Sequence, residues 1–417
     1  MRTKWGDTPV GGVRGAARRR GILLSYGLVD EIVTAIPVIG APLLRAALGL
    51  TYGQLGLLFA VAALSGFVFE PVLGLWSDRY SKRGWILGAL IVLTGCFGAL
   101  GLANTYGELL VLFAGYYPAV GIAVGLAQAV VVDESSDATR TMTRWTLMAG
   151  IGDVVGPLAI TAIAAGHYGW RALAWLGATL WAALWVATVP VPFALAPSSS
   201  RGPDGGRRDS LGTWALVREA VAIPTLWRWA ILAWIPTMID ELLLAFAALY
   251  LHDVQHASEA EVGLVITGTL VAGMAALVLL DRVGVLKGMA DQRPRRLLAL
   301  MAVGVLLGMV GFLTAATPLA AGGGLAVVGL FGAGWYPIAQ GRTFAEVPGR
   351  AVVVRAITSL GAPLEALLAA VVGFVAQRWG LAVGVACLGT APLLLLAALA
   401  GRWSAEAPAG SARSVRS

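Results

Sequence analysis

The sequence predicts an all-α membrane protein with twelve transmembrane helices in two pseudo-symmetric six-helix bundles. Its 417 residues are 58% hydrophobic and only 13% charged, with a mean hydropathy of +0.79. That is too little charge to cover a soluble protein of this length. The 54 Gly, 19 Pro and 15 Trp are typical of membrane helices, which tolerate Gly and Pro and place Trp at the interfaces. Each half also carries an Asp-Glu pair inside a long apolar stretch, at Asp30-Glu31 and Asp240-Glu241.

Apolar stretches of about 20 residues, the length that a helix needs to cross a bilayer, are separated by charged or Gly- and Pro-rich joints. They predict spans at 22–44, 53–75, 84–103, 108–131, 145–166, 170–193, 226–251, 261–280, 296–316, 321–342, 352–376 and 380–401. The polar segment PSSSRGPDGGRRDS between the sixth and seventh spans predicts a flexible linker. The expected organisation is a basic tail at 1–21, a bundle at 22–194, a linker at 195–222, a second bundle at 223–402 and a tail at 403–417.

Basic residues lie almost entirely on one side of these spans. With a cytoplasmic N-terminus, 27 of the 30 Lys and Arg residues fall on the cytoplasmic side, and only Arg45, Arg171 and Arg378 fall outside. Cytoplasmic loops are enriched in Lys and Arg. We therefore expect a multi-pass protein of the cytoplasmic (inner) membrane with both termini in the cytoplasm. This bias accounts for the net charge of +7 without a nucleic-acid partner. The run 18–20 of three arginines is interpreted as part of the tail, because no small-residue cleavage site follows it.

Five short matches in the same order relate the two halves and indicate an internal duplication. They are the two acidic pairs, Gln54-Leu55-Gly56-Leu57 with Glu261-Val262-Gly263-Leu264, Asp78-Arg79 with Asp281-Arg282, Tyr116-Tyr117-Pro118 with Trp335-Tyr336-Pro337, and Arg144 with Arg355. Duplicated transporters place the substrate site near the bilayer midplane, between the repeats.

Acidic residues within the spans are the first candidates for function, because carboxylates at bilayer depth are costly and usually mark an ion or substrate path. The candidates for proton coupling or substrate binding are Asp30, Glu31, Asp240, Glu241, Asp153, Glu365 and Glu70. Adjacent helical residues point about 100° apart, so one member of each pair is expected to face a cavity and the other a neighbouring helix. Burial and like charge favour proton uptake by such groups. The alternative is a structural role, in which each pair caps or hydrogen-bonds a discontinuous helix.

The joint after the second span reads Gly74-Leu-Trp-Ser-Asp78-Arg79-Tyr-Ser-Lys82-Arg83. It resembles the loop G-x-x-x-D-R-x-G-R-R of the major facilitator superfamily, with Ser81 where the family has Gly. The resemblance implies the major facilitator fold, and it implies that Gly74, Asp78, Arg79 and Arg83 form a latch that stabilises the outward-facing state. The alternative is a basic cytoplasmic loop with a helix cap.

Two further stretches resemble exporters of this superfamily. Gly152-Asp-Val-Val-Gly156-Pro157 is similar to the core of the antiporter motif G-x-x-x-G-P, although the later Gly-Gly of that motif is absent. Small residues four apart also allow ordinary close helix packing. The stretch 48–58, with Glu70-Pro71, is similar to the fosmidomycin-resistance group of drug exporters. Tyr116 and Tyr117 stand where many members carry an arginine in the fourth span, so a coupling scheme that uses that arginine is not carried over.

In the resembled fold, spans 1, 4, 7 and 10 line a central cavity. Its expected polar and aromatic lining is Tyr116, Tyr117, Gln128, Trp335, Tyr336 and Gln340. The three histidines, at 167, 252 and 256, are expected at the outer surface. The two cysteines, Cys96 and Cys387, lie within spans, and neither a disulfide nor a metal-ligand spacing is predicted.

Together these features predict a secondary active transporter that works by alternating access, with proton-coupled efflux of an amphipathic or cationic compound. A proton-coupled importer, a facilitator of a small metabolite and a divalent-cation carrier are the alternatives. The sequence shows no phosphate-binding G-x-x-x-x-G-K-[ST] loop and no nucleophile with a base, so neither ATP drive nor an enzyme is expected. The expected partners are the small-molecule substrate, protons and the lipid bilayer. No cofactor is expected, and the chain is expected to be a monomer.

Overall fold

The computed structural model describes residues 13–77, 81–133, 138–191, 222–237, 240–346, 357 and 359–401. The first bundle consists of α1 (Val13–Ile39), α2 (Ala41–Leu48), α3 (Tyr52–Ser77), α4 (Lys82–Leu100), α5 (Tyr106–Asp133), α6 (Ala138–Ala165) and α7 (Trp170–Thr188). The second bundle consists of α9 (Pro224–Thr237), α10 (Asp240–Asp253), α11 (Glu259–Arg282), α12 (Gly284–Gln292), α13 (Pro294–Thr314), α14 (Pro318–Gly332), α15 (Trp335–Glu346), the 3-10 turn Ser359–Gly361, α17 (Ala362–Trp379), α18 (Leu381–Leu388) and α19 (Thr390–Ala400).

The predicted spans are helical, which confirms the expected all-α membrane fold. Within the described residues, 10 stretches are long and apolar enough to cross a membrane. The sixth and eleventh predicted spans correspond to α7 and α17, of 19 and 18 residues. Both helices carry charged residues, namely Arg171 in α7 and Glu365 with Arg378 in α17.

The first predicted span is two helices rather than one. The chain bends at Gly40, and α2 begins directly after it with Pro42 in its first turn. Proline lacks a backbone N–H, which the first turn of a helix does not need. The span therefore restarts as the short helix α2 and ends at Gly49, whose φ of 61° is a left-handed conformation that favours glycine.

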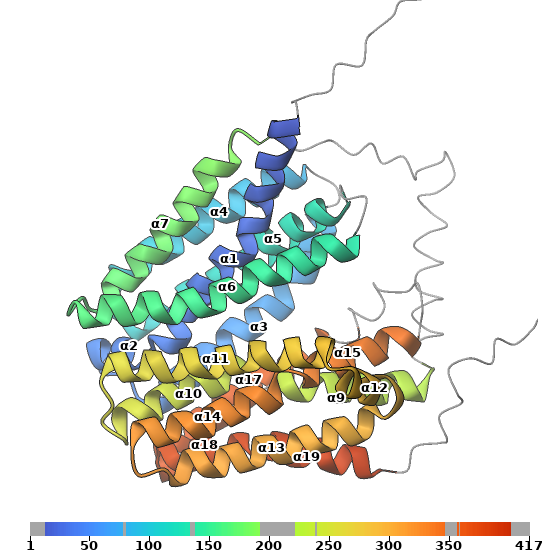
Figure 1. Ribbon diagram of the computed structural model, residues 1–417. Helices are drawn as coiled ribbons and strands as arrows, with labels where there is room; N and C mark the ends of the chain where they lie inside the picture. Colours follow the sequence, from blue (N-terminus) through green and yellow to red (C-terminus); the bar gives the residue numbers. More distant parts are fainter. Residues whose placement is uncertain are drawn as a thin grey trace, which may run out of the picture.

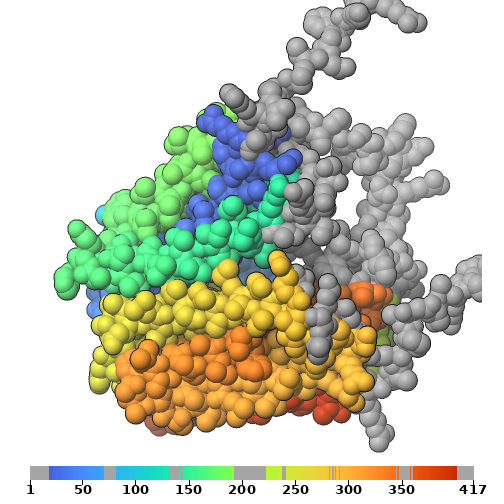
Figure 2. All heavy atoms as spheres, in the orientation of Figure 1, coloured from blue at the N-terminus to red at the C-terminus, as the bar shows by residue number. Residues whose placement is uncertain are grey.

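The two bundles lie side by side, with the first (blue to green) above the second (yellow to red) in Figure 1. Four pairs of elements make the main described contacts between them: α3 packs on α17, α6 packs on α11, and α1 and α2 each pack on α10. Figure 2 shows the surface of α6 (green) lying along that of α11 (yellow). The pairs α3–α17 and α6–α11 are equivalent in the repeat. Each joins the second span of one half (spans 2 and 8) to the fifth span of the other half (spans 11 and 5).

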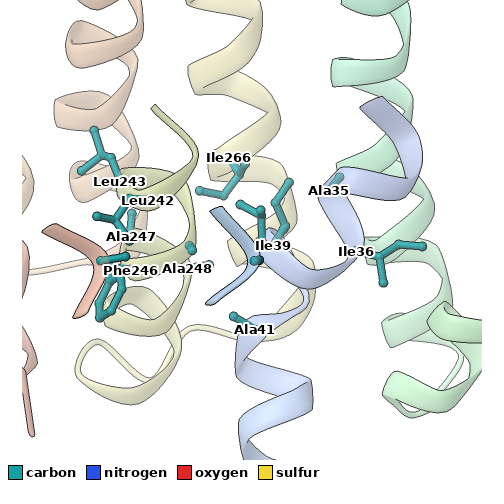
Figure 3. Close-up of a cluster of buried hydrophobic side chains, with 14 of the residues drawn as sticks. Ala35, Ile36, Ile39, Ala41, Leu242, Leu243, Phe246, Ala247, Ala248 and Ile266 are labelled. Carbon is teal, nitrogen blue, oxygen red and sulfur yellow. The ribbon is translucent and has the colours of Figure 1, made fainter. Parts of the chain in front are cut away.

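One end of the molecule is called the closed end, because the two bundles are in direct contact there. At this end α1 and α10 finish, and α3 and α11 start. Figure 3 shows Ile39 of α1 lying toward Ala248 of α10 and Ile266 of α11, within one apolar core. Beside it, α3 crosses α17 so closely that a Cβ atom on Gly56 would lie 2.8 Å from the Cα atom of Gly373. Only glycine permits this approach.

Candidate functional site

Close packing of α6 on α1 builds the first part of the site. A Cβ atom on Gly152 would lie 2.6 Å from the carbonyl oxygen of Leu28 and 2.8 Å from the Cβ atom of Glu31. One turn further on, a Cβ atom on Gly156 would lie 2.8 Å from that of Ala35. The Gly-x-x-x-Gly spacing therefore allows α6 to touch the backbone of α1. The motif thus has a packing function, which brings the residue after Gly152 to the acidic pair of α1.

That residue is Asp153, and it lies against Glu31. The two carboxyl groups are hydrogen-bonded to each other. A carboxylate can only accept hydrogen bonds, so the contact requires a proton on at least one of the two groups. Asp30 lies on the adjacent face of α1, where the charges of Glu241 and Asp153 act on it. Its Oδ1 atom is buried and has no hydrogen-bond partner among the described residues.

The second bundle contributes Glu241, at the start of α10. The Tyr117 hydroxyl of α5 donates a hydrogen bond to Glu241 Oε2 at 3.3 Å, across the boundary between the bundles. Glu241 is exposed, and it lies close enough to Asp30 and Glu31 for its charge to act on both. Acidic groups from the two repeats therefore meet at the interface between them.

A small cavity adjoins Glu241. Its described lining is Pro37, Val38, Phe59, Ala63, Tyr116, Tyr117, Glu241, Leu242, Ala245, Glu365 and Ala369. The volume is about 30 Å³, which is enough for a water-sized group but far below that of a drug-sized ligand site. The wall is aromatic and apolar with two carboxyl groups, a combination that suits a cation attached to an apolar body.

Among the described residues, spans 1, 2, 4, 7 and 11 line this small cavity. Spans 1, 4 and 7 are among the four that the resemblance places around a central cavity. The crossing of α3 on α17 brings spans 2 and 11 to the small cavity as well. Because the two helices touch at Gly56 and Gly373, the next turns of each helix, with Phe59 and Ala369, form the wall.

Tyr116 and Tyr117 are the two tyrosines of α5 that border the cavity. Their ring centroids lie 5.5 Å apart in an edge-on arrangement. Tyr116 also contacts Phe97 and Phe113 edge-on, each at 5.3 Å. Tyr116 is therefore held within the aromatic core of the first bundle, while Tyr117 reaches across to Glu241.

The other predicted site residues do not line the described cavity. Trp335 is buried in the apolar core, Tyr336 is exposed, and Gln340 and Gln128 are half-buried. The Trp335 Nε1 and Gln340 Oε1 atoms are buried without a hydrogen-bond partner in the described part of the chain. Glu70 lies in α3 and Asp240 begins α10, but their side chains are outside what the structure describes.

The predicted latch falls partly outside the described residues, which do not include Asp78 and Arg79. Gly74 lies within α3. Arg83 is exposed and donates from Nη2 to the carbonyl oxygen of Val189 at 2.6 Å, which ties the start of α4 to the end of α7. This contact lies within the first bundle.

A polar cluster that the sequence did not single out lies at the closed end. Arg45 of α2 and Tyr52 of α3 both bind the side chain of Asp253, at the end of α10. One signal was available. Arg45 is one of the three basic residues on the side that is otherwise depleted of them, and such an exception to the charge bias needs a reason.

The described residues contain no group of three or more His, Cys, Asp or Glu side chains arranged to hold a metal ion. The acidic residues on α1, α6 and α10 are joined instead by the contact between Glu31 and Asp153 and by the Tyr117 hydroxyl.

Comparison with known proteins agrees with this architecture. Residues 23–361 match the sequence profile of the Major Facilitator Superfamily. Over 165 residues the chain is 30% identical to the fosmidomycin resistance protein of Escherichia coli (strain K12), and the match spans 37% of this chain and 38% of that protein.

Three crystal structures illustrate the similarity in fold. The nucleoside transporter NupG has a TM-score of 0.69 at 11% identity, over 92% of this chain and 100% of that one. A bacterial homolog of the human lysosomal transporter Spinster, inward-facing and unoccupied, has a TM-score of 0.69 at 16% identity, over 95% and 100%. The D-xylose-proton symporter has a TM-score of 0.65 at 14% identity, over 92% and 96%.

Proposed function

Because the chain belongs to the major facilitator superfamily and is a membrane transporter of small molecules, we propose that it couples proton entry to the export of an amphipathic cation. The transport cycle is alternating access, in which the two bundles rock around a site at their interface. The protein acts as a monomer in the cytoplasmic membrane, with both termini in the cytoplasm.

The contact between Glu31 and Asp153 is the observation that carries the proposal. Two carboxyl groups in a low-dielectric setting cannot both ionise without strong repulsion, so the pair retains a proton that it releases when its surroundings change. Asp30 lies beside the pair and Glu241 faces it from the other bundle. Relative motion of the bundles alters the distance to Glu241, and this links proton binding to the conformational change.

The cavity beside Glu241 supports a cationic substrate. Glu241 and Glu365 supply negative charge, and Phe59, Tyr116 and Tyr117 supply aromatic surface. A cation is attracted both by carboxylates and by aromatic faces. The cavity of about 30 Å³ widens as the bundles move apart, because its wall comes from both of them. Substrate binding is therefore expected in a more open state.

Two similarities support export rather than import. One is the partial match to the fosmidomycin resistance protein. The other is the antiporter-like motif Gly152 to Pro157, whose glycines seat Asp153 against Glu31. Proton-coupled import is the second candidate, since a D-xylose-proton symporter has a similar fold. A divalent-cation carrier is less favoured, because carboxylates suit hard cations but the described residues form no metal-holding group.

Transport into proteoliposomes under imposed pH gradients tests the proposal. Ethidium, an amphipathic cation, is followed by its fluorescence on DNA trapped inside the vesicles. Antiport predicts uptake driven by an acidic interior, as protons leave and ethidium enters. Symport predicts uptake driven by an alkaline interior, and a facilitator equilibrates ethidium equally under both gradients. Either of these results would overturn the proposed antiport.

The phosphonate fosmidomycin is the opposite probe, because it is an anion. If the acidic cavity selects cations, fosmidomycin is taken up far more slowly than ethidium under the same acidic-inside gradient. Preferential uptake of fosmidomycin would contradict a cationic substrate, while its dependence on the gradient would still report on proton coupling.

A further inference from the structure

The closed end is held by a charged contact between the two bundles. Arg45 Nη1 donates to Asp253 Oδ2 at 2.7 Å, and the Tyr52 hydroxyl donates to the same oxygen at 2.9 Å. The guanidinium carbon of Arg45 also lies 4.3 Å from the centroid of the Tyr52 ring. Two side chains of the first bundle thus hold one carboxylate of the second, and they brace each other through a cation–π contact.

The other oxygen of Asp253 is bound within its own bundle. The ring nitrogen Nδ1 of His252 lies 2.7 Å from Asp253 Oδ1, and Nε2 lies 3.2 Å from Glu259 Oε1 at the start of α11. These contacts within the second bundle hold the Asp253 carboxylate in one orientation, in which its Oδ2 atom points to Arg45. Its side chain is only 14% exposed and that of Arg45 is 30% exposed, so water screens the pair less than it screens a surface ion pair.

Neighbouring contacts place this cluster among other close contacts between the bundles. The Tyr52 backbone N–H donates to Gln377 Oε1 of α17 at 3.2 Å. One turn along α3, Gly56 touches Gly373. Gly263, the repeat counterpart of Gly56, faces the Thr161 side chain of α6. A transporter that opens at this end must break all of these contacts, and the Arg45–Asp253 pair is the charged member of the set.

We propose that Arg45, Tyr52 and Asp253 form an ionic gate that holds the closed end shut and sets the balance between the two access states. The gate rests on the proposed alternating access but not on the direction or the coupling ion of transport. The apolar contacts around Ile39 close the same end without requiring a particular partner. The charged contact has one defined geometry, so its loss is expected to release the end selectively.

Distances between spin labels on the two bundles test the gate without measuring transport. Leu102 follows α4 in the first bundle and is 62% exposed, and Leu319 lies in the first turn of α14 in the second bundle and is 85% exposed. Both residues lie at the closed end, and neither makes the contacts that define the Arg45–Asp253 cluster. Each is replaced by a labelled cysteine after Cys96 and Cys387 have been changed to alanine. Pulsed electron paramagnetic resonance then gives the distance distribution in lipid nanodiscs.

The distance between the two labels is short when the closed end is shut and long when it is open. The protein with an unaltered gate is expected to show mainly the short distance. Arg45→Gln or Asp253→Asn shifts the ratio of long to short distances by roughly tenfold, which is typical for loss of a hydrogen bond to a charged group. Tyr52→Phe removes a single oxygen and gives a smaller shift in the same direction, which keeps the test available if a charge variant misfolds. The exchange Arg45→Asp with Asp253→Arg restores the short distance.

Arg378→Gln is the matched control. Arg378 is another arginine at the closed end. Its guanidinium carbon lies 5.9 Å from the centroid of the Trp379 ring, and both residues belong to α17. This variant is expected to keep the unaltered distance distribution. Unchanged distances in Arg45→Gln, Asp253→Asn and Tyr52→Phe would overturn the gate, as would failure of the exchanged pair to restore the short distance. A protein that moves no ethidium but responds in this way would contradict the proposed function and leave the gate in place.

Discussion

Glu31 of α1 and Asp153 of α6 share a hydrogen bond between their carboxyl groups inside the first bundle. The sequence separates them by more than a hundred residues, and the bare backbone of Gly152 brings them together. A carboxyl pair of this kind carries an exchangeable proton. Because the pair lies within one bundle, motion between the bundles changes its surroundings but leaves the pair intact.

Neutral replacement of either member is expected to abolish proton coupling. Glu31→Gln and Asp153→Asn keep an amide that can hydrogen-bond but cannot release a proton. Ethidium uptake driven by an acidic interior should fall by at least about a hundredfold, which is the low end of the effect of losing a positioned proton-transfer group. Exchange of ethidium without a gradient should persist, because it needs no net proton movement.

Glu108→Gln is the control for these two variants. Glu108 is an exposed acid in the first turn of α5, where it accepts a hydrogen bond from the Asn104 backbone N–H at 2.7 Å. Its removal should leave gradient-driven uptake unchanged. If Glu31→Gln and Asp153→Asn transport as well as Glu108→Gln, the carboxyl pair has no part in coupling.

Loss of the Tyr117 hydroxyl is expected to weaken substrate binding. Tyr117→Phe keeps the aromatic ring and removes only the hydrogen bond to Glu241, which is long at 3.3 Å. The dissociation constant for ethidium should rise about threefold to tenfold, as for one modest hydrogen bond. Tyr106→Phe is the matched control, because its hydroxyl donates to the Gln54 carbonyl oxygen at 3.0 Å, outside the cavity lining. Equal effects of the two variants on ethidium binding would argue against a substrate contact at Tyr117.

Ethidium affinity is expected to fall as the pH falls. A cation binds an ionised carboxylate, and protons compete for the same oxygen atoms, so acid removes the attraction. Glu241 is the exposed carboxylate beside the cavity. Glu241→Gln should therefore lower the affinity at high pH and flatten its dependence on pH, as measured by fluorescence titration in detergent. A pH slope in Glu241→Gln as steep as that in the unaltered protein would place the titrating group elsewhere.

The positions of the spans and of most acidic candidates could be predicted because the bilayer restricts both. Hydrocarbon requires apolar helices of a fixed length and makes each internal carboxylate conspicuous. Of the pair Asp30-Glu31, one member was expected to face a neighbouring helix and the other a cavity. Glu31 does face α6, whereas Asp30 is not among the described residues that line the small cavity.

The partners of these groups could not be predicted in the same way. Asp153 pairs with Glu31 because of how α6 packs on α1, and Arg45 reaches Asp253 only because the bundles are closed at that end. The first relationship depends on tertiary packing and the second on the conformational state. The Gly152-x-x-x-Gly156 spacing indicates close packing of α6 but does not identify α1 as its partner, and no spacing in the sequence relates Arg45 to Asp253.

Substitution of Gly152 is expected to destabilise the protein and disturb the site together. In Gly152→Ala the new methyl group meets the Leu28 carbonyl oxygen and Glu31 Cβ, so α6 must move away from α1. Overpacking of this kind costs about 1–3 kcal/mol of unfolding free energy.

Gly88→Ala is the matched control, since a Cβ atom on Gly88 meets nothing within 4 Å and alanine favours the helix by about 1 kcal/mol. Thermal unfolding in one detergent should therefore rank Gly88→Ala at or above the unaltered protein and Gly152→Ala clearly below it. Gly152→Ala should also lose gradient-driven ethidium uptake, because Asp153 no longer rests on Glu31. Equal unfolding temperatures for the two alanine variants would show that α1 and α6 are not in the close contact on which the carboxyl pair depends.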